Sequence, residues 1–135
     1  MQKYKTNWDL SLLYKNENDP EIEKYLKKYE SAYGKLEKRY KGKDFTSSAS
    51  KLLEALKYRE ELFSDLDGNV PHWYFALRTD LNSDDSVAGA LATKIEQRIT
   101  KAAGRITFFH LAIFNTPKAK QKVYLKDKNL APFRY

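Results

Sequence analysis

The chain contains no cysteine among its 135 residues. This absence excludes disulfides, zinc sites built on thiolates and cysteine nucleophiles, and it fits a reducing compartment. No apolar run approaches the ~20 residues that cross a bilayer. Residues 1–8 also lack the apolar stretch of a signal peptide. We therefore expect a cytoplasmic protein without a membrane partner.

Histidine is also scarce, and the motifs of the common hydrolases are missing. His72 and His110 fall in different predicted helices, and neither belongs to an H-E-x-x-H zinc motif. There is no G-x-S-x-G nucleophile elbow and no glycine-rich phosphate loop. We interpret His72 as a surface or cap residue and His110 as a residue at the edge of the core. The sequence thus predicts no catalytic residue, no cofactor-binding residue and no metal ligand in this chain.

Charge is positive overall but unevenly distributed along the sequence. The formal net charge is +7. Acids dominate between Glu54 and Asp85, whereas bases dominate from Arg98 onward and include a cluster of lysines from Lys118 to Lys128. Such asymmetry indicates either a surface for an acidic partner or a solvated lysine-rich helix face.

Aromatic residues are frequent, and the chain has ten tyrosines. Exposed tyrosines beside lysines would suit single-stranded nucleic acid. However, Tyr29, Tyr33 and Tyr40 recur at helical spacing, which is more typical of core residues. We therefore expect no specific nucleic-acid partner.

The apolar spacing predicts helices almost throughout. Residues 1–18 lack a helical period and are expected to form an extended arm that packs Trp8 and Tyr14 against the helical body. Asp19 and Pro20 are suited to begin a helix, and Gly42 is suited to follow its end. The apolar residues of this helix lie on one face: Ile22, Leu26, Tyr29, Tyr33, Leu36 and Tyr40.

Four more helices are expected after Gly42. One follows residues 46–48, one runs from about Pro71 to Leu81, a long one covers 85–114, and a short one covers 118–125. Gly89 and Gly104 in the long helix suggest close helix contacts. Short connections favour an all-α fold in which antiparallel helical hairpins stack as a bundle. We predict a single domain, 1–135, with the arm at 1–18, hairpins at 19–67 and 70–114, and a short helix and truncated connection at 116–135.

Several segments together resemble a known family. Trp8-Asp9-Leu10-Ser11-Leu12-Leu13-Tyr14, Asp19-Pro20-Glu21-Ile22 and Tyr40-Lys41-Gly42-Lys43 resemble the start of oligoendopeptidase F. The resemblance continues through Leu77-Arg78-Thr79-Asp80 to Leu130-Ala131-Pro132-Phe133, and so covers essentially the whole chain. Leu12 departs from the family, which often has an acid there. The W-D-L-S segment is distinctive, whereas the rest is a helical pattern that many proteins share.

The resemblance implies a function that this chain does not perform alone. Oligoendopeptidase F enzymes are cytoplasmic zinc metallopeptidases, related to thimet oligopeptidase, that cleave short peptides inside an all-α bowl. The family's zinc is held by H-E-x-x-H and a further glutamate in its C-terminal half, and no position here matches those residues. The chain would be the non-catalytic N-terminal lobe that helps wall the channel. Its partners would be the C-terminal catalytic domain of the same parent protein and the parent's oligopeptide substrate.

Two other functions stay open at this point. The first is a free-standing helical protein-interaction module with a basic partner surface. The second is a weak nucleic-acid binder that uses the lysines from Lys118 to Lys128. An H-E-x-x-H motif after Tyr135 in the parent gene would favour the peptidase over both.

Overall fold

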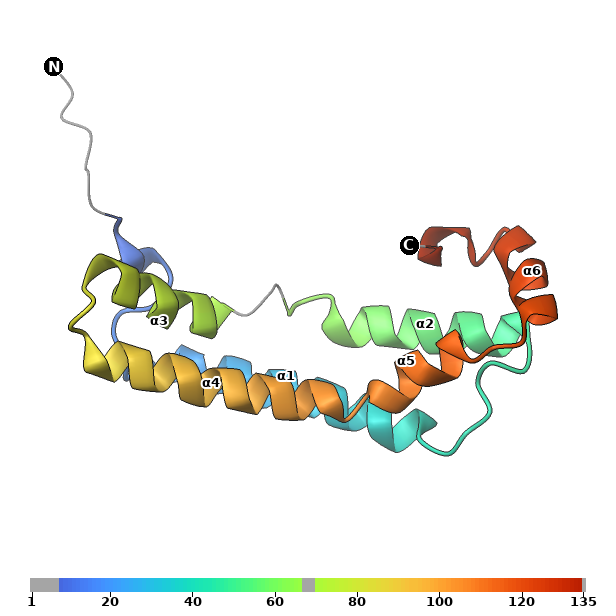
Figure 1. Ribbon diagram of the computed structural model, residues 1–135, viewed down its shortest axis with the longest axis horizontal. Coiled ribbons are helices and arrows are strands. Elements are labelled where there is room, and N and C mark those ends of the chain that lie inside the picture. The colour runs from blue at the N-terminus through green and yellow to red at the C-terminus, as the bar shows by residue number, and fades with distance from the viewer. Residues whose placement is uncertain (1–7, 67–69, 135) are drawn as a thin grey trace, which may run out of the picture. The chain divides into compact units, whose positions relative to one another are not determined.

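A computed structural model describes residues 8–66 and 70–134 of the chain. Within these ranges it has six α-helices, two 3-10 turns and no strand (Figure 1). The elements are η1 (Leu10–Leu12), α1 (Pro20–Tyr40), α2 (Ala49–Phe63), α3 (Val70–Leu81), α4 (Ser86–Gly104), α5 (Thr107–Phe114), α6 (Lys118–Lys126) and η2 (Ala131–Phe133). The helices pack as a bundle, in which α4 contacts both α1 and α3. The predicted all-α fold is therefore confirmed.

The chain divides into two compact units. Unit 1 comprises Met1–Glu30 and Leu66–Lys101, and unit 2 comprises Ser31–Asp65 and Ala102–Tyr135. Each unit draws on both of the hairpins expected at 19–67 and 70–114. The assignment of 1–135 to a single domain stays a prediction. No helix in the described ranges is long and apolar enough to span a membrane.

The helix ends follow the capping residues of the sequence. Asp19 accepts a hydrogen bond from the Glu21 amide at 3.0 Å, which satisfies a free donor at the start of α1. Gly42, just beyond the end of α1, has a φ of 74°. This left-handed conformation favours glycine, as expected for a residue that follows a helix. Ser48 caps α2 by accepting from the Lys51 amide at 3.2 Å.

The prediction of one long helix over 85–114 is wrong, because the helix is broken near residue 105. The Arg105 amide bonds to the Ala102 carbonyl at 3.0 Å and the Ile106 amide to that of Ala103 at 3.2 Å. These are three-residue spacings, so the helix tightens and ends before α5 begins. The break leaves both Ile106 and Phe109 buried. The apolar stripe passes through the break without interruption, so hydrophobic spacing could not reveal it.

A buried tyrosine helps to pack the N-terminal segment of unit 1. Tyr14 is buried, and its ring meets that of Tyr74 edge-on with centroids 5.3 Å apart. Trp8 behaves differently, since 66% of its surface is exposed. The expectation that Trp8 packs against the helices is therefore wrong. The 3-10 turn η1 holds the backbone here, with Asp9 accepting from the Ser11 amide at 3.1 Å, so Trp8 is not needed to order it.

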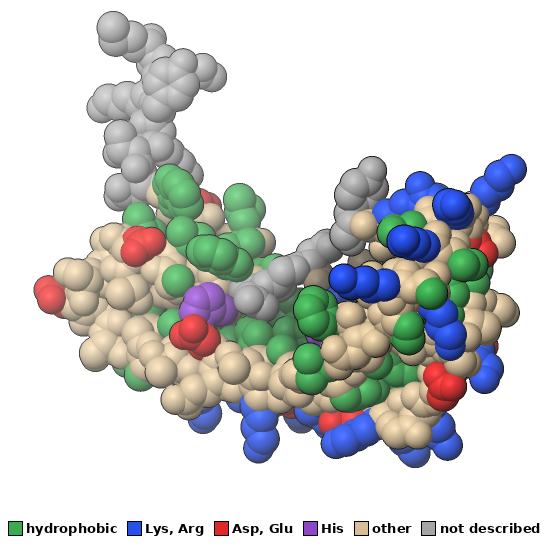
Figure 2. Space-filling view, turned by 45° about the vertical axis from the view of Figure 1, so that its right-hand side comes forward, with side chains coloured by type: hydrophobic (Ala, Val, Ile, Leu, Met, Phe, Trp, Pro, Cys, Tyr) green, Lys and Arg blue, Asp and Glu red, His purple; other side chains and the backbone are tan. Residues whose placement is uncertain are grey.

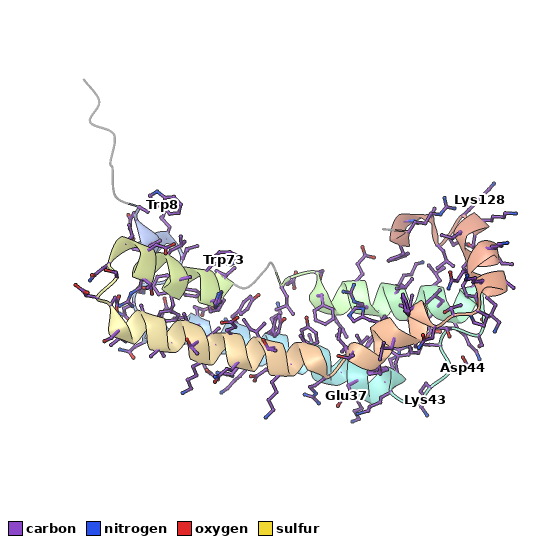
Figure 3. All side chains as sticks on the ribbon, in the orientation of Figure 1. Trp8, Glu37, Lys43, Asp44, Trp73 and Lys128 are labelled. Atoms are coloured by element: carbon purple, nitrogen blue, oxygen red, sulfur yellow. The ribbon has the colours of Figure 1, made fainter. Side chains whose placement is uncertain are left out.

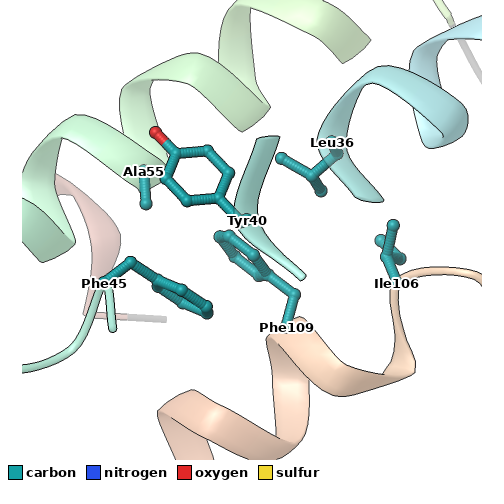
Figure 4. Close-up of a cluster of buried hydrophobic side chains, with 6 residues drawn as sticks. All are labelled: Leu36, Tyr40, Phe45, Ala55, Ile106 and Phe109. Carbon is teal, nitrogen blue, oxygen red and sulfur yellow. The ribbon is translucent and has the colours of Figure 1, made fainter. Parts of the chain in front are cut away.

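Unit 2 is built around an aromatic cluster (Figure 4). The ring of Phe109 stacks on that of Phe45 at a centroid distance of 4.7 Å, and Tyr40 meets both rings edge-on. Offset stacking and edge-on contact are the favoured geometries of aromatic pairs. Leu36, Ala55 and Ile106 complete the buried cluster. It joins α1, α2 and α5, which fixes the faces that these helices turn outward.

The glycines that suggested close helix contacts do not make them. A Cβ atom built on Gly89 or Gly104 would meet nothing within 4 Å. The expectation for these two positions is therefore wrong. The tight glycine is Gly34 in α1, where a Cβ would lie 3.1 Å from Nη1 of Arg105. Gly34 makes room for a guanidinium that binds Glu37 at 3.2 Å.

Candidate functional site

Unit 2 carries a groove of about 940 Å³ between α2, α5, α6 and η2. Its apolar lining comes from Leu52, Leu56, Phe109, Ile113, Phe114, Pro117, Leu125, Leu130 and Phe133. Positive charge enters the lining through Arg59, Lys118 and Arg134, and no aspartate or glutamate of the described ranges lines it. Lysine and arginine side chains gather over the α6 end of the molecule (Figure 2). The groove is thus apolar inside and basic at its edges.

Hydrogen bonds hold the α6 wall of the groove in place. The Tyr124 hydroxyl donates to the Thr46 carbonyl at 2.7 Å, and Lys120 Nζ donates to the Ser47 carbonyl at 3.2 Å. Gln121 donates to the Thr116 carbonyl at 2.6 Å. These bonds attach α6 to the loop before α2 and to its own start. The groove is therefore preformed, as binding sites usually are.

Arg59 is the most unusual side chain of the groove. It is half-buried, and its Nε atom is fully buried without a hydrogen-bond partner. Its guanidinium carbon lies 5.7 Å from the centre of the Phe63 ring, a distance at which a cation is attracted to an aromatic face. Leaving a buried donor of a charged group unpaired costs free energy. An anion bound at the rest of the guanidinium would offset its charge.

The other arginines show how this protein usually treats a guanidinium. Arg39, Arg78, Arg98 and Arg105 each form an ion pair with a carboxylate, at distances of 2.7 to 3.2 Å. Within the described residues, no carboxylate pairs with Arg59 or Arg134. Both of these line the groove. The unpaired arginines are therefore gathered at one place.

The surroundings of His110 lower the pKa of its imidazole. The residue lies on α5 and lines the groove. Burial lowers the pKa of His110, and the positive charge of Arg59 lowers it further. The pKa of His110 therefore lies below its ordinary value of 6.5. His110 is exposed, and its assignment to the edge of the core stays a prediction.

His72 has a different setting, in unit 1. Its Nδ1 lies 3.3 Å from the Ala92 carbonyl oxygen of α4, which can only accept a hydrogen bond. The ring is half-buried and joins α3 to α4 instead of capping a helix. Across the described ranges, no three His, Asp or Glu side chains are grouped to hold a metal ion. No ligand set for zinc can therefore be assigned to the part of the chain that the structure describes.

A second exposed feature lies on unit 1. Trp8, just before η1, and Trp73, in α3, are both exposed (Figure 3). Leu12, which follows Trp8 in the η1 turn, is 87% exposed. Exposed aromatic residues of this kind are common at protein interfaces. No buried unpaired polar group accompanies them, so they define no chemistry for a ligand.

Sequence reasoning missed the groove, although one signal for it was present. Arg59 follows Leu52 and Leu56 at helical spacing, so it lies on the apolar face of α2. An arginine on an apolar face needs a partner or a route to solvent. The closure of the groove by α6 depends on contacts between distant segments, and spacing along the chain does not show these.

The sequence matches no protein-family profile, no curated protein and no solved structure.

Proposed function

We propose that the chain is the non-catalytic N-terminal lobe of an oligoendopeptidase F-like zinc metallopeptidase, in which it shapes the channel that admits short peptides. The observation that carries the proposal is that η1, which lies in the first resemblance segment, contacts α3, the helix that carries the Leu77–Asp80 segment. Tyr14, which ends the first segment, packs on Tyr74 of α3. Arg78, from the Leu77–Asp80 segment of the same helix, binds Glu17 at 2.9 Å. Segments that share a family pattern and also pack together support a common structural role.

The first segment also has a local structure that accounts for its residues. Asp9 accepts hydrogen bonds from the amide of Ser11 at 3.1 Å and from its hydroxyl at 2.6 Å. This arrangement begins the turn η1 and explains why aspartate and serine stand two residues apart. The turn η1 contacts α3. The W-D-L-S segment therefore builds a docked turn.

This chain's contribution to peptide cleavage would be steric and indirect. A zinc ion, where the parent protein binds one, activates water and polarises the peptide carbonyl. The described residues offer no ligand set for it, so we assign no hydrolytic step to this chain. A helical wall can instead contact the peptide away from the scissile bond and exclude folded proteins. The exposed aromatic residues of unit 1 would suit such contacts.

The direct test is to express the complete reading frame that contains this chain. We expect its product to hold zinc and to cleave quenched-fluorescent oligopeptides, with activity lost on chelation and restored by zinc. The isolated chain, as the matched control, should show neither property. A complete reading frame without H-E-x-x-H would overturn the proposal.

The channel role can be tested separately in that full-length protein. Removing residues 1–135, or substituting exposed apolar residues such as Trp73, should raise activity on long substrates relative to short ones. Activity ratios on matched long and short peptides would measure this. An equal loss on both would reduce the lobe to a stabilising support.

A second candidate function is a helical protein-interaction module, and the groove of unit 2 favours it. The groove joins an apolar floor to unpaired arginines, which is a typical composition for a protein-binding surface. A weak nucleic-acid binder is less favoured, because the lysines of α6 accompany no element that reads bases. The two leading candidates are compatible, since a lobe of an enzyme can also bind a partner.

A further inference from the structure

We propose that the groove of unit 2 is a docking site for an amphipathic helix of a partner protein, and that Arg59 binds a carboxylate on the apolar face of that helix. The groove would have this role whether or not the chain belongs to a peptidase. The apolar surface, the unpaired charge and the helical walls each contribute to the choice of occupant.

The apolar surface indicates that the groove is normally covered. Phe114 and Leu125 both line it, and they are 80% and 56% exposed. Phe109 forms its floor and is fully buried. A floor of this kind with large apolar residues exposed at the rim is the composition of a protein-binding surface. Apolar side chains of a partner would remove this surface from water.

The charge requires that the occupant be anionic. Arg59 presents a buried, unpartnered Nε, and Lys118 and Arg134 add positive charge to the same lining. Among the residues that the structure describes, no acidic side chain lines the groove to compensate. A carboxylate can accept two parallel hydrogen bonds from the terminal Nη atoms of one guanidinium. It would thereby neutralise the charge of Arg59 without reaching the fully buried Nε.

The walls of the groove favour a helical protein segment over other anions. They are formed by α2, α5, α6 and η2, and the described residues offer no strand edge that an extended peptide could join. Helices in such grooves bind by apolar residues that recur at three- and four-residue spacing. Much of the floor is aliphatic, with Leu52, Leu56 and Ile113. These aliphatic side chains suit the leucine face of such a helix.

Two synthetic peptides test the proposal on the intact chain. Both are fluorescein-labelled amphipathic helices with a leucine face, and they differ only by glutamate or glutamine at one position on that face. Anisotropy titration should show the glutamate peptide binding roughly 10-fold tighter or more, because a hydrogen bond to a charged group is worth ~1.5–3 kcal/mol. Arg59→Gln should abolish the difference between the two peptides. Arg134→Gln, on the same groove, should keep most of it.

A second measurement follows the histidine beside Arg59. A carboxylate bound at Arg59 offsets the positive charge that lowers the pKa of His110. NMR titration should therefore show a higher pKa for His110 with the glutamate peptide than with the glutamine peptide. A thermal melt of Arg59→Gln should give a midpoint no lower than that of the wild type, because no carboxylate in the described residues loses a partner and a buried unpaired donor is removed.

Several outcomes would overturn the proposal. Equal affinity of the two peptides, or discrimination that survives in Arg59→Gln, would remove the role of Arg59. Displacement of the glutamate peptide by a single-stranded oligonucleotide at equal or lower concentration would identify a phosphate site instead. Self-association in sedimentation that is lost in Arg59→Gln would identify a second copy of the chain as the occupant.

Discussion

The two units of the molecule differ in how many of their arginines are paired with carboxylates. In unit 1, Arg78 and Arg98 are each held by two carboxylates, including 2.8 Å from Arg98 Nε to Glu30 and 2.9 Å from Arg78 to Asp85. In unit 2, Arg39 and Arg105 each bind one carboxylate, while Arg59 binds none within the described residues. Unit 1 therefore pairs both of its arginines with carboxylates of its own. Unit 2 leaves charge unpaired beside an apolar groove, which is a property of a surface built to meet something else.

The packing of the units differs as well. Ion pairs in unit 1 join α1 to α4, because Arg98 reaches both Glu23 and Glu30. In unit 2 the helices are joined mainly by the aromatic cluster around Phe109. Substitution of charged residues should therefore affect unit 1 most, and substitution of aromatic residues should affect unit 2 most. The following predictions test this difference.

The largest effect is expected in the core of unit 2. Phe109→Ala removes a fully buried ring that touches Phe45 and Tyr40. Loss of a buried phenylalanine costs ~3–5 kcal/mol in the free energy of unfolding. Phe114→Ala, on the same helix but 80% exposed, is the matched control and should cost less than about 1 kcal/mol. Urea denaturation followed by circular dichroism measures both, and equal losses would show that Phe109 is not central to the core.

A smaller effect is expected from the ion pairs of unit 1. Arg98→Ala removes hydrogen bonds to Glu23 and Glu30, and the partial exposure of all three side chains limits the loss to ~1–2 kcal/mol. Arg59→Ala in unit 2 is the contrasting variant and should be nearly neutral, since no carboxylate loses its partner. A larger loss from Arg59→Ala than from Arg98→Ala would reverse the comparison of the units.

The same ion pairs predict a dependence on acid pH. Hydrogen bonds from Arg98 are the main cause of a lowered pKa for Glu23 in the folded state. Stability from this carboxylate is present above its ordinary value of 4.5 and is lost as the pH falls through the folded value. Arg98→Ala should therefore bring the Glu23 pKa back up and weaken the acid dependence of unit 1. NMR titration of the Glu23 side chain measures the shift directly.

Local chemistry made much of the fold predictable, as the start of α1 shows. Asp19 and Pro20 determine where α1 begins, and Gly42 follows its end with a positive φ. Each of these acts through neighbouring backbone groups, so the sequence carries the information. The break after Gly104 was not predictable, because it is stabilised by the burial of Ile106 and Phe109 in the core of unit 2.

The candidate site was far less accessible to sequence reasoning. Arg59 is identified as unusual only when its possible partners are known in space, and the groove needs α6 folded against the loop at Thr46. Trp8 shows the opposite error, since a large aromatic residue suggested burial but is exposed. Capping residues specify helix ends well, whereas long-range contacts decide which residues face a partner.

A modest effect is expected from two helical glycines, one in each unit. Gly89→Ala in α4 of unit 1 adds a methyl group where nothing lies within 4 Å, so it should stabilise by roughly 0.5–1 kcal/mol. Gly34→Ala in unit 2 places its methyl group 3.1 Å from Arg105 Nη1 and must displace that guanidinium from Glu37. It should gain less or lose stability. A larger gain at Gly34 than at Gly89, measured by thermal melts, would mean that Arg105 moves without cost.

The smallest effect on stability is expected from His110. It gives unit 2 a dependence on pH that differs from that of unit 1. Burial and the charge of Arg59 lower the pKa of His110 below the ordinary value of 6.5, so the unfolded chain binds this proton more readily than the folded one. The stability contribution of His110 is complete above the ordinary pKa of 6.5. It is lost as the pH falls from 6.5 through the lower pKa of the folded state, so unfolding becomes easier over this range. His110→Gln should remove this step, which lies at higher pH than the carboxylate transitions of unit 1.

Amide hydrogen exchange of α5, compared between wild type and His110→Gln from about pH 8 to about pH 5, measures this step. The two proteins should differ in how exchange protection changes across this range, after correction for the intrinsic exchange rate. Arg59→Gln should shrink the difference by removing the second cause of the lowered pKa, whereas identical profiles for all three proteins would show that His110 titrates without any coupling to folding.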